Sequence, residues 1–308
     1  MSGTIYTLPV NVAGTNTQVQ FNDGGAFGAD AGLTYNKTTD ALSVTGSVIV
    51  PIVAAASSGN VNLILAPIGT GAIQSQIADN TVTGGNARGQ FAVDLQRIRT
   101  TANQVASGNY SFAVGQDNIA SGNYSFAVGA FNSATAISSF ALGLANTASG
   151  TRAIALGDRS LARLSCQFAL GAGVFGSATG KAQYNIIPLG VATTDATPTA
   201  LAGLADTITL QNNSALRFNI LVIATVTGGG NTSGWDLRGV IKRGTNAAST
   251  ALVGTVTTTL VGQDAGASGW AIAATANTTT GGLTITATGQ AGTTIRWVAT
   301  VECAEVAF

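Results

Sequence analysis

Residues 107–176 read SGNYSFAVGQDNIA, SGNYSFAVGAFNSA, TAISSFALGLANTA, SGTRAIALGDRSLA and RLSCQFALGAGVFG, which are five consecutive units of fourteen residues. Self-similarity at a fixed period predicts stacked structural repeats. Fourteen residues are too few for a helical hairpin, because a lone helix below about 12–15 residues is marginal in water. The period therefore predicts a β-solenoid in which each unit forms one coil.

The centre of each unit is an apolar residue, an alanine, a second apolar residue and a glycine. This triplet alternates as a strand does, so the large side chains point to one face and the alanines to the other. We expect two short strands and two tight turns per coil, with each coil parallel to the preceding one. The glycine ends the strand, where a positive φ or a close backbone approach excludes a Cβ. The predicted repeat core consists of Phe112, Val114, Gly115, Phe126, Val128, Gly129, Phe140, Leu142, Gly143, Ile154, Leu156, Gly157, Phe168, Leu170 and Gly171.

The alanines of these triplets form a ladder on the opposite face. We expect the large residues to fill the coil, but each coil supplies only about three of them, so a single stack has a thin core. A small, uncharged and regular face lets a neighbouring copy approach closely. We therefore expect the inter-subunit face of an oligomer to consist of Ala113, Ala127, Ala141, Ala155 and Ala169.

The motifs SFAVG, SFALG, AIALG and QFALG resemble the head repeats of trimeric autotransporter adhesins, and the same repeat is similar to segments of many phage tail fibres. The resemblance covers residues 107–176 and is specific in both period and motif. In that family the repeat forms a left-handed parallel β-roll with three chains side by side. The resemblance implies a homotrimer with a shaft, and it implies no chemistry.

The composition narrows the class of protein. Of 308 residues only 8% are charged, thirteen basic residues balance thirteen acidic ones, and 45% are hydrophobic. Balanced charge removes any argument for electrostatic attraction to nucleic acid or acidic membranes. Low charge with many Gly, Ala, Thr and Val residues is typical of turn-rich β architecture rather than disorder. The distant Cys166 and Cys303 are expected to be buried free thiols, since two cysteines make no disulfide framework.

The chain starts MSGTIYTLPV, which lacks the basic and apolar regions of a secretory signal. No run of residues approaches the ~18 apolar residues of a membrane-spanning helix, so we expect no membrane insertion. A cellular trimeric adhesin needs both a signal and a membrane anchor. We therefore favour a virion protein that is made in the host cytoplasm and exposed on the particle surface.

Residues 1–46 are predicted to form β-hairpins. A turn at Asn22–Gly25 follows the alternating Gln18–Phe21, and a polar turn at 37–40 separates Leu33–Asn36 from Ala41–Val44. The stretch TQVQFNDGGAFGADAGLTYNKTTDALSVTG (17–46) resembles sequences near the start of many phage fibre proteins. By that resemblance, residues 1–46 are the virion-attachment region and contact other virion proteins.

Residues 47–106 continue the β pattern as a shaft with a leading coil. Residues 60–73 form a fibre-like phrase of a strand, a Pro/Gly turn and a strand. Residues 90–94 (QFAVD) resemble a repeat centre, with Phe91 preceding Phe112 by twenty-one residues. This spacing is seven residues longer than the fourteen-residue period, and the additional segment contains Arg97 and Arg99. These arginines pair with Asp94, pair with carboxylates of a neighbouring copy, or are solvated.

Residues 181–308 change period and predict an antiparallel, jelly-roll-like β-sandwich, since seven or eight strands are divided by Gly- and Asn-rich turns. Trp235 is a candidate receptor contact because it follows a polar Gly/Asn loop, and the alternative is a core tryptophan. The expected strands are 208–210, 216–226, 235–242, 251–258, 270–276, 283–287 and 295–306.

The sequence predicts no catalytic residue, no cofactor and no metal site. Without histidine there is no Ser-His-Asp triad and no His-rich metal site. The enzymatic alternative is a tailspike glycan depolymerase, whose chemistry generally needs two carboxylates flanking a glycosidic bond. The candidate carboxylates are Asp117, Asp158, Asp206, Asp236 and Asp264.

The sequence thus indicates an all-β, elongated homotrimer divided at 1–46 (attachment), 47–106 (shaft and leading coil), 107–180 (β-roll) and 181–308 (sandwich tip). Its expected function is a virion tail fibre whose trimeric tip binds a host cell-surface glycan or protein. The alternatives are a capsid (head) fibre or decoration protein, a cellular trimeric adhesin and a tailspike depolymerase.

Overall fold

The computed structural model describes residue 15 and residues 17–23, 26–38, 41–44, 69–176, 178–204 and 207–308. In these residues the fold is all-β, as predicted, and the only other regular segments are two single-turn 3₁₀ segments at Ala247–Ser249 and Ala265–Ala267. The chain divides into two compact units, residues 1–64 and residues 65–308.

The first unit contains the predicted hairpins. Strand β1 (Gln18–Asp23) pairs antiparallel with β2 (Ala26–Asn36), which pairs antiparallel with β3 (Ala41–Val44). Both hairpin predictions are confirmed. Of the strand-turn-strand phrase expected over residues 60–73, residues 60–68 lie outside the described residues, and the described end is β4 (Ile73–Gln74).

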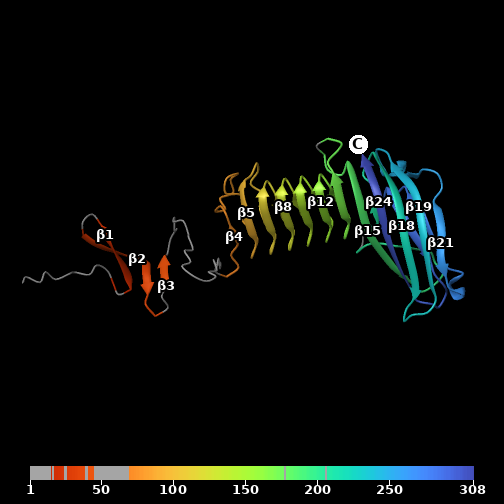
Figure 1. Cartoon of the computed structure of the whole chain (residues 1–308), viewed down its shortest axis with the longest axis horizontal. Coiled ribbons are helices and arrows are strands. Elements are labelled where there is room, and N and C mark those ends of the chain that lie inside the picture. The colour runs from red at the N-terminus through yellow and green to blue at the C-terminus, as the bar shows by residue number, and fades with distance from the viewer. Residues whose placement is uncertain are drawn as a thin grey trace, which may run out of the picture. The chain divides into compact units, whose positions relative to one another are not determined.

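The predicted β-solenoid occupies the start of the second unit and is drawn as a row of parallel arrows in Figure 1. Its long strands pair in parallel at an offset of fourteen residues, so that Phe112, Phe126, Phe140, Ile154 and Phe168 lie in one row. We call these strands the repeat sheet: β6 (Phe112–Gln116), β8 (Phe126–Ala130), β10 (Phe140–Leu144), β12 (Ile154–Asp158) and β14 (Phe168–Ala172). A second sheet closes the coils: β7 (Ile119–Ala120), β9 (Ser133–Ala134), β11 (Thr147–Ala148) and β13 (Leu161–Ala162).

The alanines, and not the large residues, fill the coils. Ala113, Ala127, Ala141, Ala155 and Ala169 are 0% exposed in the single chain and face the buried alanines of the second sheet. The prediction that these alanines form the inter-subunit face, with the Phe, Val, Ile and Leu residues as the coil interior, is therefore wrong. A fourteen-residue coil turns so tightly that its two sheets leave room only for methyl groups, and the larger side chains point outward.

In each long strand a glycine comes directly after the second outward-pointing residue, because successive coils approach closely at that position. Gly143 has a φ of +121°, and a Cβ at this position would overlap the carbonyl oxygen of Gly157 in the next coil. Gly115 and Gly129 are held in the same way by the coils that follow them. The expected role of the glycine, a positive φ with close backbone approach, is confirmed at these positions.

The alignment of the leading coil with the first repeat differs from the predicted alignment by two residues. Strand β5 (Val93–Ile98) pairs with β6 so that Val93, not Phe91, lies opposite Phe112. Phe91 instead has a φ of 56° and takes the turn position of Tyr110. The sequence-based alignment was wrong because FAV occurs in both segments, whereas hydrogen bonding placed VDL against FAV.

The tip is a two-layer antiparallel sandwich, as predicted. Its larger sheet has the order β19-β18-β24-β15, with β20 and β21 both pairing with β19, and the smaller sheet is β16-β23-β17 with β22 on β23. The larger sheet comprises β15 (Ala182–Thr193), β18 (Ser214–Val226), β19 (Thr232–Arg243), β20 (Ala251–Leu252), β21 (Thr257–Gln263) and β24 (Ile295–Ala307). The smaller sheet comprises β16 (Thr199–Ala200), β17 (Ile208–Thr209), β22 (Ala271–Asn277) and β23 (Gly282–Thr288).

The roll and the tip share one sheet. Strand β15 pairs antiparallel with β14 on one side and with β24 on the other, so the repeat sheet continues into the larger tip sheet (Figure 1). Strand β15 was not predicted because Pro188 and Gly190 interrupt its alternating pattern. Pro188 is tolerated since, on the side away from β24, β14 pairs only with residues 183–186 and the next bridge joins Gly190 to Ala202, so the proline lies between these two pairings.

A buried carboxylate connects the roll and the tip through hydrogen bonds at this junction. Glu305 is 4% exposed, and its carboxylate accepts hydrogen bonds from the guanidinium of Arg163 (2.9 Å) and from the side-chain amides of Gln183 (2.8 Å) and Asn185 (2.9 Å). Burial raises the pKa of the neighbouring Cys303 thiol to about 12, and the charge of Glu305 adds to the rise. Cys303 is therefore a neutral, buried free thiol, as predicted.

Candidate functional surface

The repeat sheet has an outer face that none of the described residues covers. On each long strand the first and third side chains point outward, and strand pairing stacks them into two rows. We call these two rows the outer face; the first is Val93, Phe112, Phe126, Phe140, Ile154, Phe168 and Ile186, and the second is Leu95, Val114, Val128, Leu142, Leu156, Leu170 and Tyr184.

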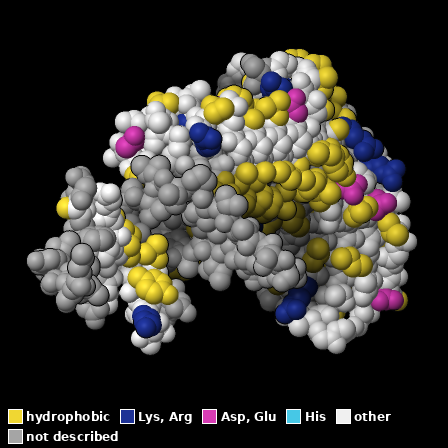
Figure 2. Space-filling view, turned by 60° about the vertical axis from the view of Figure 1, so that its left-hand side comes forward, with side chains coloured by type: hydrophobic (Ala, Val, Ile, Leu, Met, Phe, Trp, Pro, Cys, Tyr) yellow, Lys and Arg dark blue, Asp and Glu magenta, His cyan; other side chains and the backbone are white. Residues whose placement is uncertain are grey.

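The outer face exposes large apolar side chains over its whole length. Phe140 is 37% exposed, Leu142 39% and Leu170 47%. The phenyl rings stack along the row, with centroids 4.8 Å apart for Phe112 and Phe126 and 4.2 Å apart for Phe126 and Phe140. Figure 2 shows hydrophobic side chains gathered into a band on one side of the molecule, with charged side chains mainly at its margins. Contiguous apolar patches of this kind mark interaction surfaces.

An asparagine ladder, which the sequence analysis did not identify, supports the outer face from inside. The side-chain amide of Asn132 donates to the carbonyl oxygens of Val128 (3.0 Å) and of Gly143 in the next coil (2.7 Å). The Oδ1 of Asn132 accepts the backbone N–H of Asn146, which repeats the pattern, as Asn118 does one coil earlier. The signal was present in the sequence as Gly-x-x-Asn in three successive units.

A column of aromatic rings lies at the turn before the long strands. The rings of Phe91 and Tyr110 stack with centroids 4.9 Å apart, and those of Tyr110 and Tyr124 with centroids 5.1 Å apart. The predicted stacking of Tyr110 on Tyr124 is confirmed. The column ends there, because Ser138 and Arg152 take the same position in the next two coils.

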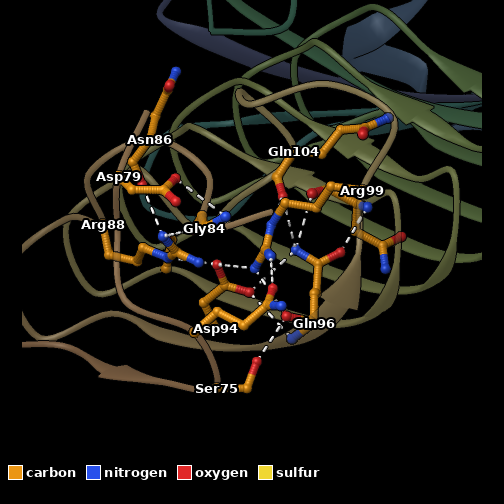
Figure 3. A network of polar contacts seen from close by, with 12 residues as sticks. Ser75, Asp79, Gly84, Asn86, Arg88, Asp94, Gln96, Arg99 and Gln104 are labelled. Atoms are coloured by element: carbon orange, nitrogen blue, oxygen red, sulfur yellow. Dashed lines mark hydrogen bonds and ion pairs between the residues drawn. The ribbon is translucent and has the colours of Figure 1, made fainter. Parts of the chain in front are cut away.

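A buried ionic cluster closes the first end of the roll (Figure 3). Asp94 takes the inward position that Ala113 holds in the next coil, and its carboxylate accepts from the guanidinium groups of Arg88 (2.7 Å) and Arg99 (3.1 Å). All three side chains are at most 1% exposed. Gln96 extends the cluster by donating to the carbonyl oxygen of Asn118. Of the alternatives left open for Arg99, pairing with Asp94 is confirmed, whereas Arg97 is exposed.

Replacing Asp94 with asparagine is expected to destabilise the leading coil by about 3–5 kcal/mol, because two buried guanidinium groups lose the one carboxylate that pairs with them among the described residues. Amide hydrogen exchange should show faster exchange in β5 than in the wild type, with β10 less affected. The matched control is Asp158→Asn, which breaks a 2.8 Å ion pair to Arg159 on side chains that are 36% and 27% exposed. The control substitution should lower the free energy of unfolding by at most about 1 kcal/mol. Equal effects of the two substitutions would contradict the assignment.

Trp235 lies in the core of the tip. It is 5% exposed and its ring stacks on that of Trp297 at a centroid distance of 5.5 Å. The candidate role of the Trp235 side chain as a receptor contact is therefore not supported, and the alternative of a core tryptophan is correct. The strand begins at Thr232, three residues earlier than expected, so Trp235 lies within it, on the inward face that it shares with the buried Ser233 and Leu237.

The carboxylates considered for glycan cleavage occupy different settings. Asp117 is 2% exposed and accepts the backbone N–H of Thr100. Asp158 is paired with Arg159, and Asp264 accepts the backbone N–H of Thr232. Asp236 lies 3.8 Å from Arg238, and Asp206 lies outside the described residues. Asp236 and Asp264 each line a shallow groove of the tip, and neither of these two grooves is lined by a second one of the described carboxylates.

Within the described part of the chain, no group of three or more His, Cys, Asp or Glu side chains could hold a metal ion. No helix among the described residues is long and apolar enough to span a membrane.

Residues 106–132 and 134–160 each match the YadA head domain repeat. These two copies contain β6 to β12 and the outer face that those strands carry. No curated protein matches the chain in sequence.

Three tailspike structures of Acinetobacter phages align with the chain at 11% identity. One is gp49 of Acinetobacter baumannii bacteriophage Fri1, a capsular polysaccharide depolymerase (TM-score 0.24; 75% of this chain and 43% of that chain). The others are the tailspikes of Acinetobacter phage vB_ApiP_P1 (0.20; 77% and 46%) and of Acinetobacter baumannii phage AM24 (0.23; 73% and 44%). The chain spans less than half the length of each of these tailspikes.

Proposed function

We propose that this chain, whose residues 106–160 consist of YadA-type head repeats, is a homotrimeric phage fibre protein whose copies pack through the outer face. The observation that carries the proposal is the uncovered pair of apolar rows on the repeat sheet. A coil interior made of alanine buries little apolar surface per residue, so a single roll is poorly stabilised. Burial of the phenylalanine and leucine rows between copies supplies the missing apolar contact, at about 1.5–3 kcal/mol for each fully buried side chain.

Each part of the chain has its own role in the fibre. The hairpins of residues 1–46, which resemble the start of phage fibre proteins, attach to other virion proteins. The roll is the shaft, and the sandwich of residues 181–308 is the tip that binds a glycan or protein on the host cell surface. Three tips on one fibre multiply weak contacts, because the second and third binding events become intramolecular. The protein acts by binding and not by catalysis.

Light scattering of the purified protein, together with labelling of intact phage particles, tests this function. We expect a mass of three chains and a label on the tail; a label on the capsid would assign the protein to a head fibre instead. The purified trimer should also reduce adsorption of the phage to its host. A monomer at micromolar concentration, or a host cell that displays the protein from its own gene, would overturn the proposal.

A further inference from the structure

The two rows of the outer face do not end with the roll. Through β15 they continue across β24, β18 and β19 of the tip, because each strand is hydrogen-bonded to the next. Opposite Ile186 the first row continues as Glu302, Asn219 and Arg238, and opposite Tyr184 the second continues as Ala304, Arg217 and Val240. Two rows that are apolar along the whole roll thus become charged when they enter the tip.

The charges of this segment have both signs and are not paired with one another. Glu302 is half-buried, whereas Arg217 and Arg238 are exposed. Among the described residues no ion pair within 4.0 Å includes Glu302 or Arg217, and Arg238 reaches only Asp236, at 3.8 Å. Glu305, three residues along β24, shows the contrast: it points inward and is paired with Arg163 at 2.9 Å. We call Glu302, Arg217 and Arg238 the charged segment of the outer face.

Apolar surface adjoins the charged segment in two directions. Across the strands, on the roll side, are Leu170 and Tyr184, which are 47% and 40% exposed. Partial burial raises the pKa of the Tyr184 hydroxyl, and the nearby charge of Glu302 adds to the rise. Further along strands β18 and β24, a shallow groove of about 300 Å³ is lined by residues that include Leu221, Ile223 and Val298. A charged group bounded by exposed apolar side chains suits an interface better than open solvent.

The apolar rows alone cannot set the axial position of one copy against another. Because the coils repeat every fourteen residues, a slip by one coil, about 4.7–4.9 Å, again places a large apolar side chain against a large apolar side chain. The charged segment occurs once in the described part of the outer face. A slip by one or more coils would place Glu302 or an arginine against phenylalanine or leucine, and an unpaired buried charge is costly.

We propose that the charged segment binds a second copy of this chain, with Glu302 of one copy paired with Arg217 or Arg238 of its neighbour, and that this pairing sets the register of the fibre. The inference rests on the proposed association of copies through the outer face. With no axial slip, Arg217 of the neighbour lies one strand from Glu302 and Arg238 lies two strands away. One strand spacing is about 4.7–4.9 Å, which is within reach of an arginine side chain. The role matches that of a single polar residue that specifies register in a coiled coil.

Charge reversal tests this pairing. The variant Glu302→Arg carries only positive charges in the segment, and the double variant Arg217→Glu/Arg238→Glu carries only negative ones. We expect each variant alone to dissociate at a concentration at least about tenfold higher than the wild type. Refolded together, they should form mixed trimers that are more stable than either alone. Asp195→Arg, a reversal in an exposed loop of the tip, should behave like the wild type.

The outcomes separate the inference from the proposed function. A wild-type chain that is monomeric would end both. A wild-type trimer whose two reversed variants are equally trimeric, or whose variants fail alone and are not rescued by mixing, would overturn the pairing and leave the fibre intact. Glu302→Gln, which keeps the shape of the side chain, covers the case in which a reversed variant does not fold, and it should also weaken the trimer. A Glu302→Gln trimer as stable as the wild type would contradict the inference.

Discussion

Replacing Phe126 and Phe140 with aspartate is expected to convert the trimer into monomers. Both rings lie on the outer face, where their centroids are 4.2 Å apart, and in the proposed trimer they lie against neighbouring copies. Each fully buried phenylalanine contributes about 1.5–3 kcal/mol, so three copies lose six such contributions. The new carboxylates would also bring six like charges into a small apolar volume, where unpaired charge is strongly disfavoured.

Light scattering over a range of protein concentrations measures this effect. The matched control is Ser133→Asp/Thr147→Asp, which places the same charges on β9 and β11, in the same two coils but on the opposite sheet. We expect the control to remain trimeric, since the proposed interface lies on the repeat sheet. Circular dichroism should show β-structure in both variants. A phenylalanine variant that stays trimeric, or a control that dissociates equally, would show that the copies meet through another face.

Enlarging Ala141 to leucine is expected to disrupt the roll itself. Ala141 is 0% exposed, and its methyl group packs in an interior made of other alanines. Three additional carbon atoms have no space there, and overpacking of a well-filled core typically costs about 1–3 kcal/mol and occasionally more. We expect the loss of stability to reach or exceed the upper end of this range. Both sheets of the coil are hydrogen-bonded to the coils before and after, so they cannot move apart to make room for the larger side chain. In a stacked array, loss of one coil also removes its interfaces with both neighbours.

The neighbouring substitution Leu142→Ala is the matched control. Leu142 is 39% exposed on the outer face, so its truncation removes proposed contacts between copies and leaves the coil interior unchanged. Urea denaturation should show a large loss of stability for Ala141→Leu at any protein concentration. Leu142→Ala should lose stability mainly at low concentration, where the trimer dissociates. The reverse ranking would mean that the large residues fill the coil, as the sequence pattern first indicated.

Period and turn chemistry were readable from the sequence because they depend on local backbone geometry. The fourteen-residue period specified parallel coils in which Phe112 lies beside Phe126 and Phe126 lies beside Phe140, and the structure has this register. Gly at the ninth position specified a positive φ in the first four units, and the Asn-Asp-Gly-Gly turn specified the first hairpin. The change to longer alternating strands after residue 180 indicated the sandwich of the tip, where Trp235 and Trp297 pack together.

The direction in which each face points was decided only by the tertiary structure. The alternating pattern is the same whether the alanines or the phenylalanines face the coil interior. Which of the two rows faces inward depends on the distance between the two sheets of a coil, and no local pattern encodes that distance. The same holds for Asp94, which takes an alanine position once Arg88 and Arg99 reach it from their turns. It holds for Glu305 as well, whose partner Arg163 lies 142 residues away in the chain. Spacing along a chain determines which residues share a row, but only the packed coil determines whether that row faces the interior or a neighbouring molecule.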